Sequence, residues 1–324
     1  MKNTTELLTG NFVICDLGSA SSQGWRALGN MRRAVTLIEI DATSESSASD
    51  RNYHRRVAVR SGIAGHNTGR PFLKRKIPGG SSFLVPDPQL IQAYELEQYY
   101  ELDAQLDIPC TTLPEMLESN GIKAIDFLKT DLEGLDYEVL TSAEQIVQKA
   151  LVVQSELRFQ PFYKDEPTFY TVADYLTQQG LELITLSPQV WKYRTTHRSV
   201  QRDGRLVWAD AVFFLRPDLV LERFGSAAGP AFLKQIVLAI MLGLTNYAEY
   251  VYEQHPHLIP DTCRKEVEGA LLGPAFPQAL LRRTANGISR LPGGNFALIM
   301  AQRILLGLNR SITTHSKVPC LGSL

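Results

Sequence analysis

The feature that most limits the possible folds of this chain is a short apolar segment followed by three charged residues at alternate positions. Residues 124–128 (Ala-Ile-Asp-Phe-Leu) precede Lys129, Asp131 and Glu133, and a helical pattern begins after Gly134. Alternate side chains of a β-strand share one face, so these three point the same way if the strand continues to its end. Charges grouped at the carboxyl end of a buried strand are costly to desolvate unless they serve a site. We therefore expect the ligand-binding edge of an α/β sheet here.

Short apolar runs and helical stretches alternate from residue 11 to residue 217. The predicted strands are 12–15, 35–40, 56–59, 125–130 and 151–155, followed, after a helix over 169–179, by 181–186 and 209–215. This alternation predicts βαβ units and a parallel sheet. The last two strands, with a turn signal at Asp203-Gly204, predict an antiparallel pair at its end.

The character of the chain changes near residue 218. Beyond that point helical patterns dominate and no strand pattern is convincing; they cover 232–252, 265–272, 278–284 and 297–308. We expect one domain over 11–217 and a helical extension over 218–324, whose apolar faces pack on the domain or form a homodimer interface. Residues 62–107 are irregular and predict a long excursion over the ligand-binding edge.

Composition limits the partners and the compartment. The chain has 33 Lys and Arg against 34 Asp and Glu, for a net charge of −1, which gives no general attraction to nucleic acid or an anionic membrane. Its four cysteines match no zinc spacing, and its polar N-terminus has no signal core. The apolar run over 236–244 is too short to span a bilayer. We expect a cytoplasmic protein without a membrane span.

The ends of the first two predicted strands indicate a nucleotide site. Asp16, Gly18 and Ser19 begin a loop of small residues, where backbone N–H groups can approach a ligand. Glu39, about 20 positions further on, can accept the hydroxyls of a ribose, and Asp41 is a nearby alternative. The loop lacks the GxGxxG pattern, and together with the terminal hairpin this favours S-adenosylmethionine over NAD.

Two segments resemble the FkbM-type S-adenosylmethionine-dependent methyltransferases. Residues 125–134, followed by 138–140, are similar to the family's apolar strand, Lys-x-Asp-x-Glu-Gly motif and helix. Residues 155–163 resemble its Glu after the fifth strand and the Pro-x-Tyr that follows. The first loop departs from the family's Asp-x-Gly-Ala-Asn-x-Gly, and Pro114 stands where the family often has Asp.

The resemblance covers about residues 11–217 and implies a fold and an activity. The implied fold class is α/β, a Rossmann-like class I methyltransferase sheet that is mostly parallel, with a C-terminal antiparallel hairpin. The α-helical C-terminal extension lies outside it. The implied activity is transfer of a methyl group from S-adenosyl-L-methionine, usually to a hydroxyl oxygen, here of a sugar or secondary metabolite. The expected partner is thus a small-molecule or glycan acceptor.

The charged strand end supplies the candidate catalytic groups. A hydroxyl is a poor nucleophile, so a general base or a metal would help. Asp131 or Glu133 could accept the proton or orient the acceptor, and Lys129 could hold their charges or lower their pKa values. We expect Asp131 to be the most buried of the three and Glu133 the more substrate-facing. An ion pair that only shapes the loop is the alternative.

The neighbouring strand end adds two candidate substrate-binding residues. Glu156 and Arg158 could bind the acceptor, or they could pair with each other. The carboxylates of Asp131, Glu133 and Glu156 could also gather a divalent ion. No matching His accompanies them, so a metal site is not favoured.

Two other functional classes remain open at this stage. A non-catalytic protein could retain the methyltransferase fold as a binding or scaffolding module, and the altered first loop is the best support for this. An NAD-dependent oxidoreductase is the less favoured alternative.

Overall fold

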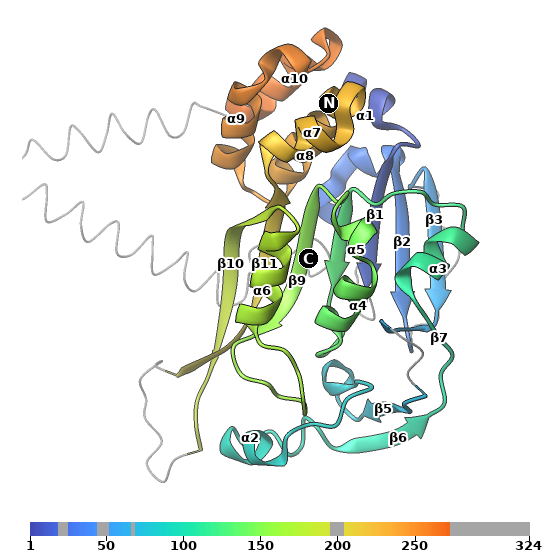
Figure 1. The fold of residues 1–324 in the computed structure, drawn as a ribbon, viewed down its shortest axis with the longest axis vertical. Helices are drawn as coiled ribbons and strands as arrows, with labels where there is room; N and C mark the ends of the chain where they lie inside the picture. The colour runs from blue at the N-terminus through green and yellow to red at the C-terminus, as the bar shows by residue number, and fades with distance from the viewer. Residues whose placement is uncertain (19–24, 44–51, 66–68, 195–203, 273–324) are drawn as a thin grey trace, which may run out of the picture.

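The computed structural model shows an α/β fold built around one seven-stranded sheet (Figure 1). The structure describes residues 1–18, 25–43, 52–65, 69–194 and 204–272. The strands lie in the order β10-β11-β9-β8-β1-β2-β3. Their bounds are Phe12–Leu17 for β1, Val35–Asp41 for β2, Arg55–Arg60 for β3, Phe127–Thr130 for β8, Val152–Arg158 for β9, Leu181–Trp191 for β10 and Arg205–Leu215 for β11.

Strand directions confirm the predicted sheet. Every neighbouring pair is parallel except the two that include β11, which is antiparallel to both β9 and β10. All seven residues of β2 are buried, because helices cover both faces of the central strands. The predicted turn at Asp203-Gly204 falls partly outside the described residues.

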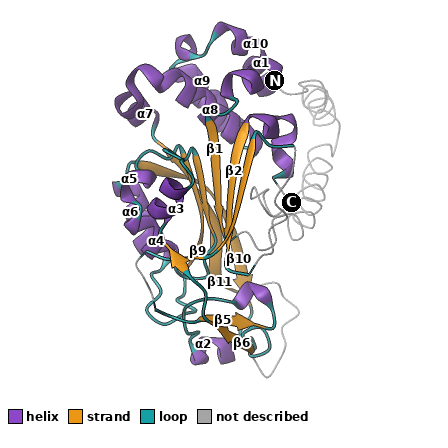
Figure 2. Cartoon of the chain, turned by 90° about the vertical axis from the view of Figure 1, so that its right-hand side faces the viewer, coloured by secondary structure: helices purple, strands orange, loops and turns teal. Residues whose placement is uncertain are grey.

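Four helices cover one face of the sheet (Figure 2). They are α3 (Leu113–Ser119), α4 (Asp136–Ser142), α5 (Glu144–Val147) and α6 (Phe169–Gln178). α3 begins with a capping box, in which Thr112 and Glu115 satisfy each other's backbone N–H groups. The core on this face joins Leu128 and Val153 of the sheet to Val139 and Leu176 of the helices.

The helices after residue 216 cover the opposite face toward the amino ends of the strands (Figure 1). They are α7 (Pro217–Phe224), α8 (Ala228–Met241), α9 (Thr245–Gln254) and α10 (Asp261–Leu272), with the short turns η3 (Gly225–Ala227) and η4 (Pro256–Leu258). Phe232 and Ile236 of α8 share one core with Phe127 and Phe214 of the sheet. The described part of the extension therefore packs on the sheet. The domain boundary between residues 217 and 218 stays a prediction.

Two further elements near the N-terminus complete this side. α1 (Lys2–Leu8) was not predicted, and Glu266 of α10 accepts hydrogen bonds from the backbone N–H groups of Asn3 and Thr4. η1 (Arg26–Ala34) connects β1 to β2. α1 thus contacts the C-terminal helices although 263 positions separate Asn3 from Glu266.

The irregular excursion lies at the carboxyl ends of the parallel strands, at the bottom of Figure 1. It contains β4 (Gly62–Ile63) paired with β7 (Cys110–Thr111), β5 (Phe72–Arg75) paired with β6 (Leu102–Leu106), and the helical segments η2 (Pro78–Gly80) and α2 (Pro88–Ala93). The structure therefore places this segment over the edge where a ligand was predicted.

Some predicted boundaries were wrong. β8 ends at Thr130 as predicted, but it begins at Phe127 and not at residue 125. The single helical stretch predicted over 232–252 is two helices, because Gly243 has a φ of +73° after the end of α8. The helices predicted at 278–284 and 297–308, and Ser19, lie outside the described residues.

One helical stretch, Pro217–Met241, has the length and composition of a membrane-crossing helix, with a mean hydropathy of 1.4. Half of its most apolar window is buried inside the protein, and Gly225, with a φ of +50°, separates α7 from α8. The buried core helix of a globular protein meets the same criteria, so this feature is weak evidence for a membrane span.

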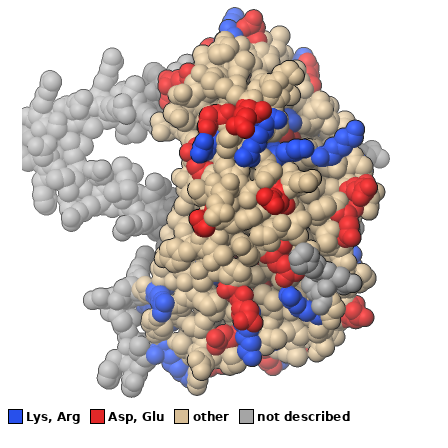
Figure 3. All heavy atoms as spheres, viewed as in Figure 1, with Lys and Arg blue, Asp and Glu red and all other residues tan. Residues whose placement is uncertain are grey.

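Charged side chains are intermixed on the face drawn in Figure 3. Acidic and basic groups lie side by side on a largely uncharged surface, in keeping with the balanced composition.

The shared core predicts that α8 contributes strongly to stability. Phe232 is fully buried, so Phe232→Ala should lower the free energy of unfolding by about 3–5 kcal/mol through lost transfer energy and the cavity left behind. Leu221→Ala on α7, where Leu221 is exposed, is the matched control and should change it by less than about 1 kcal/mol. Chemical denaturation measures both, and equal effects would contradict a core shared by α8 and the sheet.

Candidate active site

The loops that follow β1 and β8 approach each other at the carboxyl edge of the sheet. The backbone N–H of Asp131 donates to the carbonyl of Leu17 at 3.1 Å, and that of Gly18 donates to Ile40 at 2.9 Å. Gly18 has a φ of +83°, and a Cβ there would lie 1.9 Å from the carbonyl oxygen of Asp131. Only glycine permits this approach, for steric as well as conformational reasons.

A buried ion pair joins the same two strands. Lys129 and Asp16 are partners in the β1–β8 register, and Lys129 Nζ lies 3.3 Å from Asp16 Oδ1 and 3.4 Å from Asp131 Oδ2. Burial raises the pKa of Asp16 to about 6, although Lys129 opposes the shift. Burial alone would lower the pKa of Lys129, but Asp16 and Asp131 outweigh it and raise that pKa. Lys129 thus stays a fixed cation behind the site.

The order of burial at this edge differs from the prediction. The exposed side-chain fractions are 8% for Lys129, 18% for Glu133 and 33% for Asp131. Asp131, predicted to be the most buried of the three, is the most exposed. β8 ends at Thr130, so Asp131 lies just beyond it at the rim of the sheet.

Glu133 reaches the site through a turn, whereas the sequence had predicted strand alternation. It has a φ of +50°, which is rare outside glycine, and Gly134 follows with a φ of +98°. This turn brings the carboxylate of Glu133 close to those of Asp131 and Glu156, with one oxygen of each within 4.8 Å of the others.

Arg158 is the centre of an ionic cluster. Its Nη2 atom lies 2.5 Å from Glu133 and 2.9 Å from Glu156, and its Nε atom lies 2.9 Å from Glu166. The guanidinium carbon also lies 5.3 Å from the centre of the Tyr163 ring. Arg158 is buried and its charge is shared among three carboxylates. The pairing with Glu156 was one of the two predicted alternatives, and a role of Arg158 in acceptor binding stays a prediction.

Sequence reasoning missed two members of this cluster. Tyr163 belongs to the Pro-x-Tyr segment, which was noted as a resemblance without a role. Its hydroxyl donates to Glu133 at 2.9 Å. Glu166 carried no signal in the sequence, because it lies in a loop without periodicity.

The carboxylates of the cluster are shifted toward the protonated form. Burial raises the pKa of Glu133 to about 7; Arg158 lowers it, and the nearby charge of Asp131 raises it. Burial and Asp131 also raise the pKa of Glu156, against the effect of Arg158. Glu133 is therefore near the midpoint of its titration around neutral pH.

The convergence of three carboxylates raises the question of a metal ion. Carboxylate oxygens suit a divalent cation such as Mg²⁺ or Ca²⁺. However, Arg158 Nη2 already bridges Glu133 and Glu156. The guanidinium supplies the positive charge that these two groups require, so a metal site remains an unfavoured prediction.

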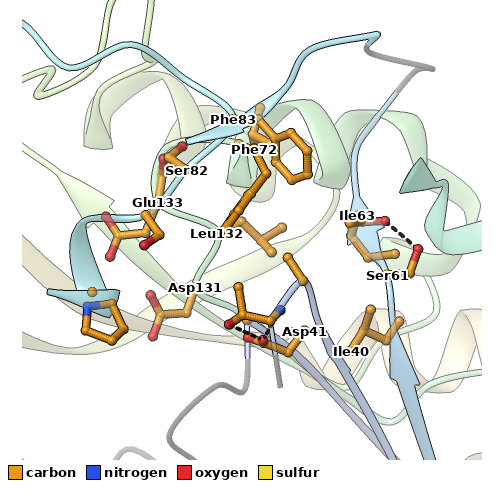
Figure 4. Close-up of a pocket in the computed structure, with 18 residues that line it drawn as sticks. Ile40, Asp41, Ser61, Ile63, Phe72, Ser82, Phe83, Asp131, Leu132 and Glu133 are labelled. Carbon is orange, nitrogen blue, oxygen red and sulfur yellow. Dashed lines mark hydrogen bonds between the residues drawn. The ribbon is translucent and has the colours of Figure 1, made fainter. Parts of the chain in front are cut away.

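A cavity of about 290 Å³ lies beside this edge, between the sheet and the excursion (Figure 4). In that view Asp131 and Glu133 lie on one side, Ser61 and Ile63 on the other, and Phe72 and Phe83 opposite Asp41. The cavity is lined by Gly18, Ile40, Asp41, Ala42, Thr43, Ser61, Gly62, Ile63, Phe72, Pro78, Gly79, Ser81, Ser82, Phe83, Asp131, Leu132, Glu133 and Leu135.

The structure distinguishes the two predicted ribose-binding carboxylates. Asp41 lines the cavity, and its Oδ1 atom accepts hydrogen bonds from the backbone N–H and the hydroxyl of Thr43. Glu39 does not line it and pairs with Arg56 of β3 at 2.5 Å. Asp41, which we had treated as the alternative, is thus the better-placed residue.

Comparison with known proteins identifies one domain of the chain. Residues 27–183 match the family described as the methyltransferase FkbM domain. The chain carries an FkbM methyltransferase domain. The match confirms the resemblance seen in the sequence, and it begins after the altered first loop. No protein in a curated set matches the chain significantly.

One solved structure is similar to the chain. It is a Streptococcus pneumoniae protein described provisionally as a tRNA (m1A22) methyltransferase, with 10% sequence identity. The alignment covers 82% of this chain and 96% of that chain, with a TM-score of 0.26. A TM-score this low carries no argument about fold or substrate. The methyltransferase fold follows from the order and directions of the strands in the seven-stranded sheet.

The close approach at Gly18 predicts a large effect of one added methyl group. Gly18→Ala should lower the free energy of unfolding well beyond the roughly 1–2 kcal/mol that a left-handed residue costs, because its Cβ collides with the Asp131 carbonyl. Gly243→Ala is the control, since Gly243 has a similar φ of +73° and no atom within 4 Å of the added Cβ. Urea denaturation measures the difference; equal losses in both variants would show that the two loops do not require the contact.

Proposed function

We propose that this chain transfers a methyl group from S-adenosylmethionine to a hydroxyl oxygen of a small-molecule or glycan acceptor. The FkbM domain supports methyl transfer in general. The donor and the type of acceptor are inferred from the chemistry of the cavity.

The charge of the cavity lining is the observation that carries the proposal. Its charged residues are Asp41, Asp131 and Glu133, and no Lys or Arg lines it among the described residues. S-adenosylmethionine has a cationic sulfonium and no phosphate, so carboxylates attract it. The pyrophosphate of NAD would meet only negative charge, which argues against the oxidoreductase alternative.

The shape of the lining also fits the donor. Asp41 at the end of β2 would accept the ribose hydroxyls, as acidic residues do in related nucleotide folds. Ile63, Phe72 and Phe83 supply apolar walls suited to the adenine ring. Asp131 and Glu133 on the other side would face the sulfonium.

The same edge supplies what an acceptor hydroxyl needs. The donor brings an activated methyl group, and the protein must hold the acceptor oxygen in line with it. Asp131, Glu133 and Glu156 are partly exposed carboxylates that can accept hydrogen bonds from hydroxyl groups. Their positive partners, Lys129 and Arg158, are buried behind them. This polarity suits an uncharged, hydroxylated acceptor, which supports a sugar or a secondary metabolite.

Donor binding is the first experiment for this proposal. Calorimetry should detect binding of S-adenosylmethionine to the wild type and none of NAD. Asp41→Asn should weaken donor binding by about tenfold or more, because the ribose loses a charged acceptor while the bond to Thr43 can persist. Glu39→Gln is the matched control on the same strand and should change affinity much less, since Glu39 does not line the cavity.

Two outcomes would contradict the proposal. A well-folded wild type that binds no S-adenosylmethionine would favour the non-catalytic scaffold. A larger effect of Glu39→Gln than of Asp41→Asn would place the ribose elsewhere. A screen of a hydroxylated metabolite extract for donor-dependent mass gains of one methyl group then identifies the acceptor.

A further inference from the structure

We propose that Glu133 takes the proton from the acceptor hydroxyl at its Oε1 atom, and that Arg158, Tyr163 and Glu166 are positioning residues for this carboxylate. The inference rests on the proposed function, since it assigns roles within the same site. It distinguishes Glu133 from Asp131, which the sequence left as equal candidates.

The two oxygens of Glu133 have different surroundings. Oε2 accepts hydrogen bonds from Arg158 Nη2 at 2.5 Å and from the Tyr163 hydroxyl at 2.9 Å. Within the part of the chain that the structure describes, no donor contacts Oε1, and the side chain remains partly exposed. One oxygen is therefore fixed by two donors, and the other presents its lone pairs to an incoming hydroxyl.

Asp131 is arranged differently. Its Oδ2 atom lies 3.4 Å from Lys129 Nζ, and Lys129 is a fixed buried cation. Asp131 is also the more exposed of the two carboxylates. This arrangement suits an orienting role toward the acceptor.

The backbone of Glu133 is held in an unfavourable conformation. Its φ of +50° is in the left-handed region, and its carbonyl accepts a hydrogen bond from the Ser82 hydroxyl at 2.7 Å. Such conformations persist only where the surroundings enforce them, and they concentrate at functional sites. Here the turn directs the side chain back toward Arg158 and Tyr163.

Glu166 aligns both donors with one buried carboxylate. Its Oε1 atom accepts from Arg158 Nε at 2.9 Å, and its Oε2 atom accepts from the backbone N–H of Tyr163 at 3.1 Å. Arg158, Tyr163, Glu166 and Glu133 thus form a closed ring of hydrogen bonds. Glu166 does not contact Glu133 in this ring and acts through the two donors.

The proposed step is a displacement at the methyl carbon of the donor. The acceptor O–H bond breaks and its proton moves to Glu133 Oε1. The acceptor oxygen forms a bond to the methyl carbon, and the C–S bond breaks with its electron pair going to sulfur. The products are the methyl ether, neutral S-adenosylhomocysteine and a protonated Glu133, which loses its proton to solvent through its exposed edge.

The protonation of Glu133 responds to several facing groups. Burial and Asp131 raise its pKa, Arg158 and Tyr163 lower it, and Glu166 raises it. The other facing groups are Glu156 of β9 and the excursion residues Tyr99 and Tyr100. The carboxylate is present above the pKa and lost as pH falls through it. Tyr163→Phe removes a lowering contact, so it should move the transition to higher pH.

The affinity ratio of S-adenosylhomocysteine to S-adenosylmethionine tests the proposal without an identified acceptor. The two ligands differ by the methyl group and the sulfonium charge, so an ionised Glu133 near the reacting atoms favours the cation. For the wild type, the preference for S-adenosylmethionine should fall several-fold as pH decreases through about 7. Glu133→Gln should abolish this pH dependence, and Tyr163→Phe should shift its midpoint upward. Tyr94→Phe, which removes a buried hydroxyl bonded to Gln160, is the control and should leave the midpoint unchanged.

The outcomes separate the alternatives. Loss of the pH dependence in Asp131→Asn but not in Glu133→Gln would overturn the proposal and make Asp131 the proton acceptor. An unchanged midpoint in Tyr163→Phe would overturn the positioning role. Binding of neither ligand to the folded wild type would instead contradict the proposed function. In transfer to the screened acceptor, Glu133→Gln should retain S-adenosylhomocysteine affinity and lose at least about 100-fold in turnover.

Discussion

The close contact between the loops after β1 and β8 determines how this site is built. Gly18 lies against the carbonyl of Asp131 because it has no Cβ, and Lys129 joins the two strands through Asp16. The contact closes the sheet edge into one wall of the cavity. It also brings Asp131 to the rim, where it lines the cavity and lies close to the carboxylate of Glu156 on β9. A bulkier residue at position 18 would separate these strands and lose the cavity wall and the charge arrangement together.

Charge is layered at this edge. The cations Lys129 and Arg158 are buried, and the carboxylates that they hold project toward the cavity and solvent. This arrangement offsets the desolvation free energy of the buried cations, since each cation has close carboxylate partners. It also leaves a negative surface, which suits the proposed cationic donor and uncharged acceptor. In the proposed mechanism, Arg158 contributes by fixing Glu133, and no ligand needs to touch it.

Much of this arrangement was predictable from the sequence. The rest depends on backbone turns and packing, which leave no periodic pattern in the sequence. Strand periodicity located the sheet and placed Lys129 and Asp131 on one face. It misplaced Glu133, because the strand ends at Thr130 and a left-handed non-glycine turn has no periodic signature. Asp41 and Glu39 share a face two positions apart, so only packing against the excursion and β3 distinguishes them. The role of Glu166 depends on loop geometry alone.

We propose that the cavity beside Gly18 and Asp131 holds the methyl donor with its sulfur toward the carboxylates. A crystal structure of the protein with S-adenosylhomocysteine would show this arrangement. In it, the ribose hydroxyls should lie on Asp41, the adenine between the apolar walls, and the sulfur opposite Asp131 and Glu133. A ligand bound elsewhere, or one with its sulfur directed away from these carboxylates, would contradict it.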